Sequence, residues 1–283
     1  MQTLTTVPDL RALIRAWRAQ GERIAFVPTM GSLHAGHIQL VKVARQHAER
    51  VVVSIFVNPT QFGVGEDFAS YPRTETCDQQ KLVAEEVDVL FLPSIADMYT
   101  ANAKTAVTVS ELSTVYCGAF RPGHFSGVAT VVCKLFNCVQ PNVAVFGRKD
   151  FQQLAVIRTM VQDLHIPVDI VGVDTMREPS GLAMSSRNSY LSPMEKQLAP
   201  QLYQTLCVAR DALLAGQVIA DIEQQATQFL LNAGFQVDYF TVCHSSDLSK
   251  ASTIDGDLVI LTAVRLGKTR LIDNSELKCV DRG

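Results

Sequence analysis

The chain has 283 residues, of which 47% are hydrophobic and 19% are charged, and its formal net charge is -3 at pH 7. This length and composition are typical of a folded globular protein of about two domains, and they exclude a disordered, collagen-like or coiled-coil chain. The near-neutral charge excludes the broad basic surface with which a protein holds nucleic acid.

The first two-thirds of the chain alternate between short apolar runs and stretches with helical spacing. Apolar runs separated by helices are typical of a parallel sheet that is buried on both faces. Strands are expected at 24–27, 51–57, 87–92, 143–146 and 168–173. Helices are expected at 35–49, 75–85, 126–139 and 150–163. The fold class predicted for this part is α/β, with a doubly wound, Rossmann-like parallel sheet.

Beyond about residue 175 the pattern changes to helices followed by strands. Ser192-Pro193, a cap residue followed by proline at the first helical position, opens a helix expected at 193–215, and another is expected at 219–233. Strands are expected at 237–243, 258–263 and 269–273. This pattern predicts a smaller α+β domain at the C-terminus.

The boundary between the two predicted domains falls in Arg177–Gly181, which contains a proline and a glycine, residues typical of loops. We therefore predict a Rossmann-like domain over 1–176 and a smaller α+β domain over 177–283 that covers the site of the first.

Nothing in the sequence predicts a membrane or secreted protein. The strongest apolar run, 51–57, is far shorter than the roughly 18–20 residues of a spanning helix, and charged residues interrupt the N-terminal segment. The seven cysteines are odd in number and include no C-x-x-C pair, which argues against a disulfide framework or a Cys-type zinc site. We expect a cytoplasmic protein with neither membrane nor nucleic acid as a partner.

Polar residues cluster after four of the predicted strands. Because the carboxyl ends of parallel strands meet at one edge of a sheet, these clusters are expected to lie at a common ligand-binding edge. The clusters are 28–37, 58–62, 147–153, and 176 together with 184–187.

The first cluster contains His34 and His37, which share one face of the helix that they open. A histidine pair at this spacing also occurs in metal sites and as a purely structural cap. However, no third ligand follows at a suitable spacing, and H-E-x-x-H is absent. The H-x-G-H motif, with Ser-Ser-Arg downstream, resembles the nucleotidylyl-transferase superfamily, whose members place both histidines near the ATP phosphates.

Six motifs in order narrow the resemblance. They are Pro28-Thr29-Met30-Gly31, Val57–Phe62, Tyr71-Pro72-Arg73, Arg121–Phe125, Gly147–Gln153 and Gly181–Asn188. Together they resemble the pantoate–β-alanine ligase family over about residues 24–191, with weaker agreement up to Asn274. Arg148 and Ser180 depart from the residues that the family often has there, Glu and Asp.

The resemblance implies an ATP-dependent ligase that forms a C–N bond. The family condenses pantoate with β-alanine to pantothenate through a pantoyl adenylate, and it releases AMP and pyrophosphate. The resemblance further implies ATP as a substrate with Mg²⁺, no tightly bound organic cofactor, and a homodimer.

The resemblance also implies roles for particular residues. Its catalytic residues match His34, His37, Lys149 and Arg187. Its ATP-binding residues match Met30, Gly31, Ser32, Leu33, His34, Ala35, Gly36, His37, Gly147, Arg148, Lys149, Asp150, Met176, Met184, Ser185, Ser186 and Arg187. Gln61 and Gln153 match the substrate-binding positions for pantoate and β-alanine, and no residue matches a metal ligand. The glycine-rich segment 63–67 is a candidate mobile cover, and Arg121 a candidate partner for a carboxylate.

Three alternatives stay open on the residues alone. One is another nucleotidylyl-transferase of the same superfamily with a different small acceptor, and a second is a relative of the tRNA synthetases. The third is a non-catalytic nucleotide-binding module. A dinucleotide oxidoreductase is disfavoured because no G-x-G-x-x-G follows the first predicted strand.

Overall fold

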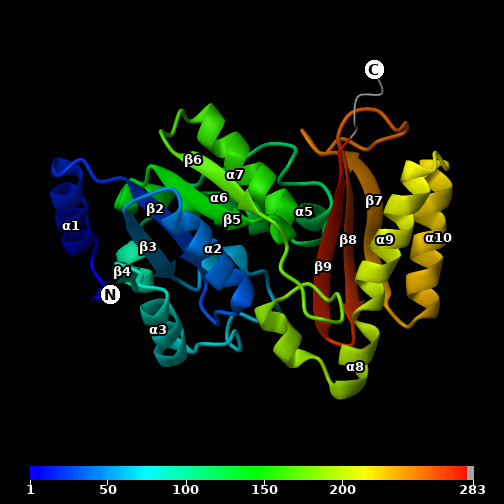
Figure 1. The fold of residues 1–283 in the computed structure, drawn as a ribbon, viewed down its shortest axis with the longest axis horizontal. Coiled ribbons are helices and arrows are strands. Elements are labelled where there is room, and N and C mark those ends of the chain that lie inside the picture. The colour runs from blue at the N-terminus through cyan, green and yellow to red at the C-terminus, as the bar shows by residue number, and fades with distance from the viewer. Residues whose placement is uncertain (279–283) are drawn as a thin grey trace. The chain divides into compact units, whose positions relative to one another are not determined.

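The structure, a computed structural model that describes residues 1–278, consists of two compact units (Figure 1). The first unit contains Met1–Arg148 and Gln153–Asp174, and the second contains Lys149–Gln152 and the chain from Thr175 onward. The role predicted for 177–283 as a cover stays a prediction.

The first unit is built on a six-stranded sheet in which every pair of neighbours is parallel, in the order β1-β4-β3-β2-β5-β6. The strands are β1 (Gln2–Leu4), β2 (Ile24–Thr29), β3 (Arg50–Ile55), β4 (Val89–Phe91), β5 (Val143–Gly147) and β6 (Asp169–Val173). The first four residues of β2 and the last five of β3 are fully buried, as expected for strands covered on both faces.

Helices connect these strands. The α-helices are α1 (Val7–Ala19), α2 (Ala35–Arg45), α3 (Glu75–Ala84), α4 (Ile95–Met98), α5 (Cys117–Phe120), α6 (His124–Val139) and α7 (Phe151–Asp163), and two short 3₁₀ turns are η1 (Pro59–Gln61) and η2 (Arg148–Asp150). Helix α2 packs on β2, β3 and β5, whereas α6 packs on α1 and β2. Right-handed crossovers that run in opposite directions place their helices on opposite faces of a sheet, so α2 and α6 cover different faces. The predicted doubly wound α/β fold is confirmed.

The strand order reverses between β2 and β5. From β2 the chain proceeds to β3 on one side, and β5 and β6 extend the sheet on the other. Ligands of open α/β sheets bind at the carboxyl ends of the strands at such a reversal. Here those ends are Thr29 of β2 and Gly147 of β5.

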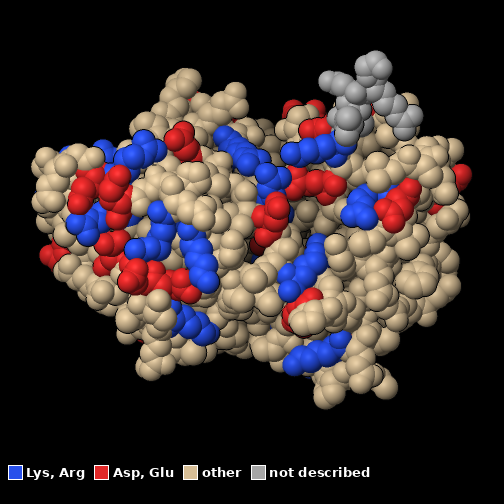
Figure 2. All heavy atoms as spheres, in the orientation of Figure 1, with Lys and Arg blue, Asp and Glu red and all other residues tan. Residues whose placement is uncertain are grey.

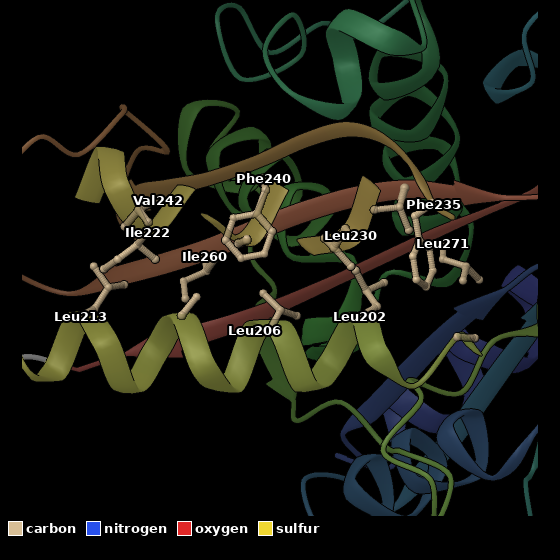
Figure 3. Packing of buried hydrophobic residues seen from close by; sticks show 14 of the residues in the cluster. Leu202, Leu206, Leu213, Ile222, Leu230, Phe235, Phe240, Val242, Ile260 and Leu271 are labelled. Atoms are coloured by element: carbon tan, nitrogen blue, oxygen red, sulfur yellow. The ribbon is translucent and has the colours of Figure 1, made fainter. Parts of the chain in front are cut away.

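The second unit packs helices on a three-stranded antiparallel sheet, in the order β7-β8-β9. Its elements are η3 (Ser186–Tyr190), α8 (Pro193–Leu198), α9 (Gln201–Leu214), α10 (Ile219–Asn232), β7 (Gln236–His244), β8 (Leu258–Leu266) and β9 (Thr269–Leu277). Figure 3 shows leucines of α9, among them Leu202, Leu206 and Leu213, pointing toward Phe240, Ile260 and other apolar side chains of this core. The predicted smaller α+β domain architecture is confirmed for this part of the chain.

Several features of these elements differ from the prediction, among them the short helices α4 and α5, which were not predicted. The helix expected over 193–215 is divided into α8 and α9 at Ala199-Pro200, because proline has no N–H to continue the helical hydrogen bonds. Strand β1 and helix α1 were not predicted. The three residues of β1 are too few for a periodic signal, and the apolar stripe of α1 consists of Leu10, Ile14 and Trp17 among charged residues.

On the face drawn in Figure 2, basic and acidic side chains lie interspersed rather than in one large patch of a single sign. Within residues 1–278, no helix is long and apolar enough to span a bilayer.

Candidate active site

The loop after β2 turns sharply at Gly31 before the chain enters α2. Gly31 has a φ of +81°, and a Cβ on this residue would lie 2.9 Å from Cγ2 of Ile55. The hydroxyl of Thr29 accepts a hydrogen bond from the N–H of Gly31 and donates one to the carbonyl of Ser54. A glycine is therefore required where the chain leaves the sheet.

Asp78 on α3 holds the next two residues of this loop. Its side chain is fully buried, and its two carboxylate oxygens accept the N–H groups of Ser32 and Leu33, each at 2.8 Å. The hydroxyl of Thr74 donates to the same carboxylate at 3.1 Å, and the ammonium of Lys81 donates to the carbonyl of Leu33. Sequence reasoning missed Asp78, which fixes the path of the chain into the H-x-G-H motif.

His34 and His37 form a reciprocal cap at the N-terminus of α2. Nδ1 of His34 accepts the N–H of Gly36 at 3.1 Å, and Nδ1 of His37 accepts the N–H of His34 at 3.2 Å. A backbone N–H can only donate, so both Nδ1 atoms carry no proton, and in each neutral ring the proton lies on Nε2. The ring centroids are 4.1 Å apart. The end of β2 therefore holds two adjacent imidazoles whose outer nitrogen atoms are hydrogen-bond donors.

Gln61 is buried beside the same loop. Its Nε2 lies 3.1 Å from Sδ of Met30, and its Oε1 accepts from Nδ2 of Asn58 at 3.1 Å. Oδ1 of Asn58 accepts from Thr60 and from the hydroxyl of Tyr99, which leaves its amide nitrogen to face Gln61. Burial raises the pKa of Tyr99 and outweighs its hydrogen bonds with Thr60 and Asn58, which lower it. The orientation of the Gln61 amide is thus set by a chain of hydrogen bonds.

Arg121 and Glu66 form an ion pair next to the backbone carbonyl of Gln61. Arg121 donates to both carboxylate oxygens of Glu66, at 2.6 and 2.7 Å. Burial opposes the ionisation of Glu66, but its hydrogen bonds with Arg121 and the charge of that guanidinium outweigh burial and lower the pKa of Glu66 to about 2. His124 bridges Arg121 to the carbonyl of Gln61. The predicted carboxylate partner of Arg121 is therefore Glu66, within the segment 63–67 whose mobility stays a prediction.

A pocket lies next to this cluster at the ends of β2 and β3. Met30, Gly31 and Ile55 line one part of it, and Arg73 and Ser94 line another. His34, His37 and Gln61 are not among its lining residues.

The end of β5 carries Gly147 and Arg148. The guanidinium of Arg148 turns toward β6, where it lies 3.4 Å from the carbonyl of Gly172 and 3.4 Å from the carboxylate of Asp174. Gln153 is half-buried in α7.

The second unit holds the remaining predicted residues. Lys149 and Asp150 lie in η2, and the carbonyl of Lys149 accepts from Nδ2 of Asn274 at 2.9 Å. Met176 is exposed, and its carbonyl accepts the N–H of Met184 at 2.9 Å. Ser185 caps the short helix η3 by accepting the N–H of Arg187.

The predicted site residues thus fall into two groups, each described within its own unit. The first unit pairs Met30 with Gln61 and His34 with His37, in the loop after β2 and the turn η1 that follows the neighbouring strand β3. The second pairs Met176 with Met184 at the base of one hairpin, and Ser185–Arg187 follow directly at the start of η3. A Rossmann-like sheet with an H-x-G-H cap at this position is the architecture of a nucleotidylyl-transferase.

Comparison with known proteins identifies the family. The family model described as pantoate–β-alanine ligase matches residues 2–276. The chain is 55% identical to the pantothenate synthetase of Methylococcus capsulatus over 277 residues, which cover 97% of each chain. The chain belongs to the pantoate–β-alanine ligase family, as the six motifs predict.

Solved structures agree. The crystal structure of pantothenate synthetase from Thermus thermophilus matches with a TM-score of 0.92 and 45% identity, over 97% of this chain and 99% of that one. The pantoate–β-alanine ligase of Francisella tularensis, solved in complex with β,γ ATP and β-alanine, matches with a TM-score of 0.82 and 34% identity, over 97% of each chain. The chain is thus a C–N ligase that joins pantoate to β-alanine, and the predicted activity is confirmed.

Proposed function

We propose that the ligation proceeds in two steps through a pantoyl adenylate. In the first step, a carboxylate oxygen of pantoate attacks the α-phosphorus of ATP, and the bond to the β,γ-phosphate group breaks to release pyrophosphate. In the second step, the amine of β-alanine attacks the activated acyl carbon, the bond to AMP breaks, and the nitrogen gives up a proton. The ATP and β-alanine bound to the Francisella ligase support this choice of substrates.

The observation that carries this proposal is the capping of α2 by Nδ1 of His34 and Nδ1 of His37. Their Nδ1 atoms are occupied by backbone N–H groups, so each ring offers an Nε2–H at the N-terminus of α2. Negative charge builds on phosphate oxygens as pyrophosphate departs, and fixed N–H donors near a helix N-terminus stabilise it. In this proposal both residues bind the phosphates, and His37 donates its Nε2–H as a hydrogen bond and keeps the proton.

Lys149 and Arg187 are the proposed cationic contacts to the triphosphate. An ammonium serves as a point charge for phosphate, and a guanidinium donates two parallel hydrogen bonds. Ser185 and Ser186 add hydroxyl donors next to Arg187 in the sequence. Neutralising the leaving group in this way lowers the barrier to its departure.

The rest of the proposed nucleotide site is formed largely by backbone. Residues 30–36 lie at the N-terminus of α2, and a Cβ added to Gly147 would have no atom within 4 Å apart from its chain neighbours, so this backbone is open to a ligand. In this proposal Asp150 orients the ribose, and Met176 contacts adenine through its backbone. Arg148 and Met184 belong to the proposed site as the residues next to Lys149 and Ser185 in the sequence.

Gln61 and Gln153 are the proposed substrate-binding residues for pantoate and β-alanine. Pantoate carries two hydroxyls and a carboxylate, and a neutral amide both donates and accepts hydrogen bonds without altering the charge of the nucleophile. Nε2 of Gln61 contacts Sδ of Met30, which is a weak acceptor. In this proposal, a substrate oxygen therefore replaces the sulfur as the acceptor.

Mg²⁺ enters this proposal as part of the ATP substrate. Among residues 1–278, no group of three or more His, Cys, Asp and Glu side chains has an arrangement suited to a metal ion. Mg²⁺ in nucleotide enzymes is commonly bound through substrate phosphates and water, where it neutralises phosphate oxygens. The proposal further includes a homodimer in the cytoplasm, as expected from the family resemblance and the sequence.

Isotope transfer tests the adenylate directly. Pantoate labelled with ¹⁸O in its carboxylate is incubated with ATP and β-alanine, and the AMP is examined by mass spectrometry. The proposal predicts one labelled oxygen in AMP, because the attacking carboxylate oxygen stays on the α-phosphorus. Label in inorganic phosphate, or AMP without label, would contradict it.

A further inference from the structure

Asp273 and Asn274 are adjacent polar residues of β9, and both are buried, with exposed fractions of 3% and 6%. Successive side chains of a strand point to opposite faces, so this pair projects from both sides of β9. Strand β9 pairs with β8 alone within the three-stranded sheet. Buried polar side chains require hydrogen-bond partners. Asp273 and Asn274 each have a partner outside the three-stranded sheet.

Asp273 binds Arg177 through two hydrogen bonds. Nη1 of Arg177 donates to Oδ2 at 2.6 Å, and Nη2 donates to Oδ1 at 3.0 Å. The guanidinium stacks over the ring of Tyr203 at 3.5 Å and also donates to the carbonyl of Gly181. The exposed fractions of the two side chains are 18% for Arg177 and 1% for Asp273. Paired guanidinium and carboxylate groups with this geometry fix each other's position strongly.

Arg177 begins the hairpin that leads to the serine pair Ser185-Ser186. A bridge joins Arg177 to Ala183, and the N–H of Glu178 donates to the carbonyl of Leu182 at 2.8 Å. Nδ2 of Asn188 then donates to the carboxylate of Glu178 and to the carbonyl of Ala183. The hairpin is thus tied both to Asp273 and to the turn Ser185–Arg187 that follows it.

Asn274 holds the other phosphate-binding segment. Its Nδ2 donates to the carbonyl of Lys149 at 2.9 Å, although 125 residues separate the two in the chain. The N–H of Asn274 also donates to Oδ1 of Asp273 at 2.8 Å. This bond links the two anchors, which are Asn274 with the carbonyl of Lys149 and Asp273 with Arg177. One dipeptide therefore contacts both the Lys149 segment and the hairpin that leads to Arg187.

We propose that Asp273 and Asn274 are positioning residues for the ATP phosphates. Asn274 fixes the backbone of Lys149, and Asp273 fixes the hairpin that leads into Ser185, Ser186 and Arg187. This inference rests on the proposed function, in which those four residues bind the triphosphate. Because both anchors belong to one dipeptide of a paired strand, the spacing between the two cationic segments is set by the backbone of β9. Phosphoryl-transfer catalysis depends mainly on such positioning.

The test uses variants of the full-length chain. Asn274→Ala removes the donor to Lys149. The double variant Arg177→Met with Asp273→Leu removes the other anchor without leaving a buried charge unpaired, which single removal would do. Ser275→Ala, next in β9, is the matched control. Steady-state kinetics are measured against each substrate, together with the affinity for a non-hydrolysable ATP analogue and the midpoint of thermal unfolding.

Both anchor variants should lower kcat/KM for ATP by between about 10- and 100-fold, since misplaced binding groups have effects of this size. The analogue should bind more weakly, whereas the KM values for pantoate and β-alanine should stay those of the wild type. Unchanged kcat/KM for ATP in a folded Asn274→Ala variant and in the double variant would overturn the inference. A parallel fall for all three substrates would overturn it too, because it would indicate a general structural role.

Lys149→Met and Arg187→Met separate this inference from the proposed function. If these two variants retain wild-type kcat/KM for ATP, the proposed phosphate contacts are wrong. If Lys149→Met and Arg187→Met lower kcat/KM for ATP while the anchor variants keep the wild-type value, the phosphate contacts are supported. Only the positioning role of Asp273 and Asn274 is then wrong.

Discussion

His34 donates its backbone N–H to Nδ1 of His37, at 3.2 Å. The interaction couples a structural role to a chemical one, because the nitrogen that caps α2 and the nitrogen proposed to face phosphate belong to the same ring. Capping fixes the tautomer, and the tautomer makes Nε2 a donor. The common capping residues Ser, Thr, Asn and Asp have shorter side chains, which cap α2 without placing a donor at the position of Nε2.

Two substitutions at His37 separate these roles. In His37→Asn the side-chain oxygen can replace Nδ1 as the cap, but no donor reaches the position of Nε2. In His37→Gln the amide can place its nitrogen near that position or cap through its oxygen, but it cannot hold both groups where the histidine ring holds them. We expect kcat to fall by about 10²–10³ in the asparagine variant, the usual effect of removing one transition-state donor. The glutamine variant should keep more activity but lose about 1 kcal/mol of stability, as measured by urea unfolding.

The opposite ranking of activity would contradict this assignment. It would mean that the cap, rather than the outer donor, carries the catalytic contribution of His37.

Asp78→Asn tests the anchor beneath the H-x-G-H loop. The carboxylate accepts the N–H groups of Ser32 and Leu33, and an amide has a single oxygen to offer them. We expect a loss of about 1–3 kcal/mol in the free energy of unfolding, because one buried donor loses its acceptor. The value of kcat should also fall, because His34 and His37 follow this loop directly. The exposed Glu75 on the same helix provides the control, and Glu75→Gln should leave stability within about 0.5 kcal/mol.

If Asp78→Asn unfolds at the urea concentration of the wild type and retains its kcat, the loop does not depend on this carboxylate.

The sequence predicted those parts of the molecule that depend on local pattern. Apolar runs such as 51–57 correspond to buried parallel strands, and the H-x-G-H motif correctly marked the start of α2. Asp78 and Asn274 escaped prediction because their roles arise from contacts across 45 and 125 residues. Buried polar residues of this kind resemble ordinary helix or strand residues until the fold shows what they hold.

The ion pair of Glu66 with Arg121 predicts a pH dependence of stability. The pKa of Glu66 in the folded protein, about 2, lies below its ordinary value of 4.5. The stabilisation from ionised Glu66 is therefore fully present above pH 4.5 and is lost as the pH falls toward 2. At neutral pH, Glu66→Gln should cost about 1.5–3 kcal/mol, the usual contribution of hydrogen bonds to charged groups.

Urea unfolding of the wild type and of Glu66→Gln between pH 7 and pH 3 measures this difference. It should stay constant above pH 4.5 and shrink below it. A difference that grows as the pH falls would show that Glu66 is not stabilised as an anion.

Gly127 permits the close approach of α6 to the turn that carries Gln61. A Cβ on Gly127 would overlap the carbonyl group of Thr60, and the carbonyl of Gly127 accepts a hydrogen bond from Asn58. Gly127→Ala must therefore push η1 away from α6. We expect a loss of about 1–3 kcal/mol, the usual cost of overpacking, measured by urea unfolding. Because Asn58 also orients the amide of Gln61, the KM for pantoate should rise more than the KM for ATP.

The matched control is Gly63→Ala, where the nearest atom would lie 3.7 Å from the added Cβ, an ordinary contact. This variant should fold with nearly wild-type stability, because nothing must move to admit the methyl group. If Gly127→Ala raises the KM values for ATP and pantoate equally, the structural change extends beyond η1. The link between this helix contact and the Gln61 amide is then wrong. If pantoate alone is affected, the tight contact between α6 and η1 serves substrate recognition as well as packing.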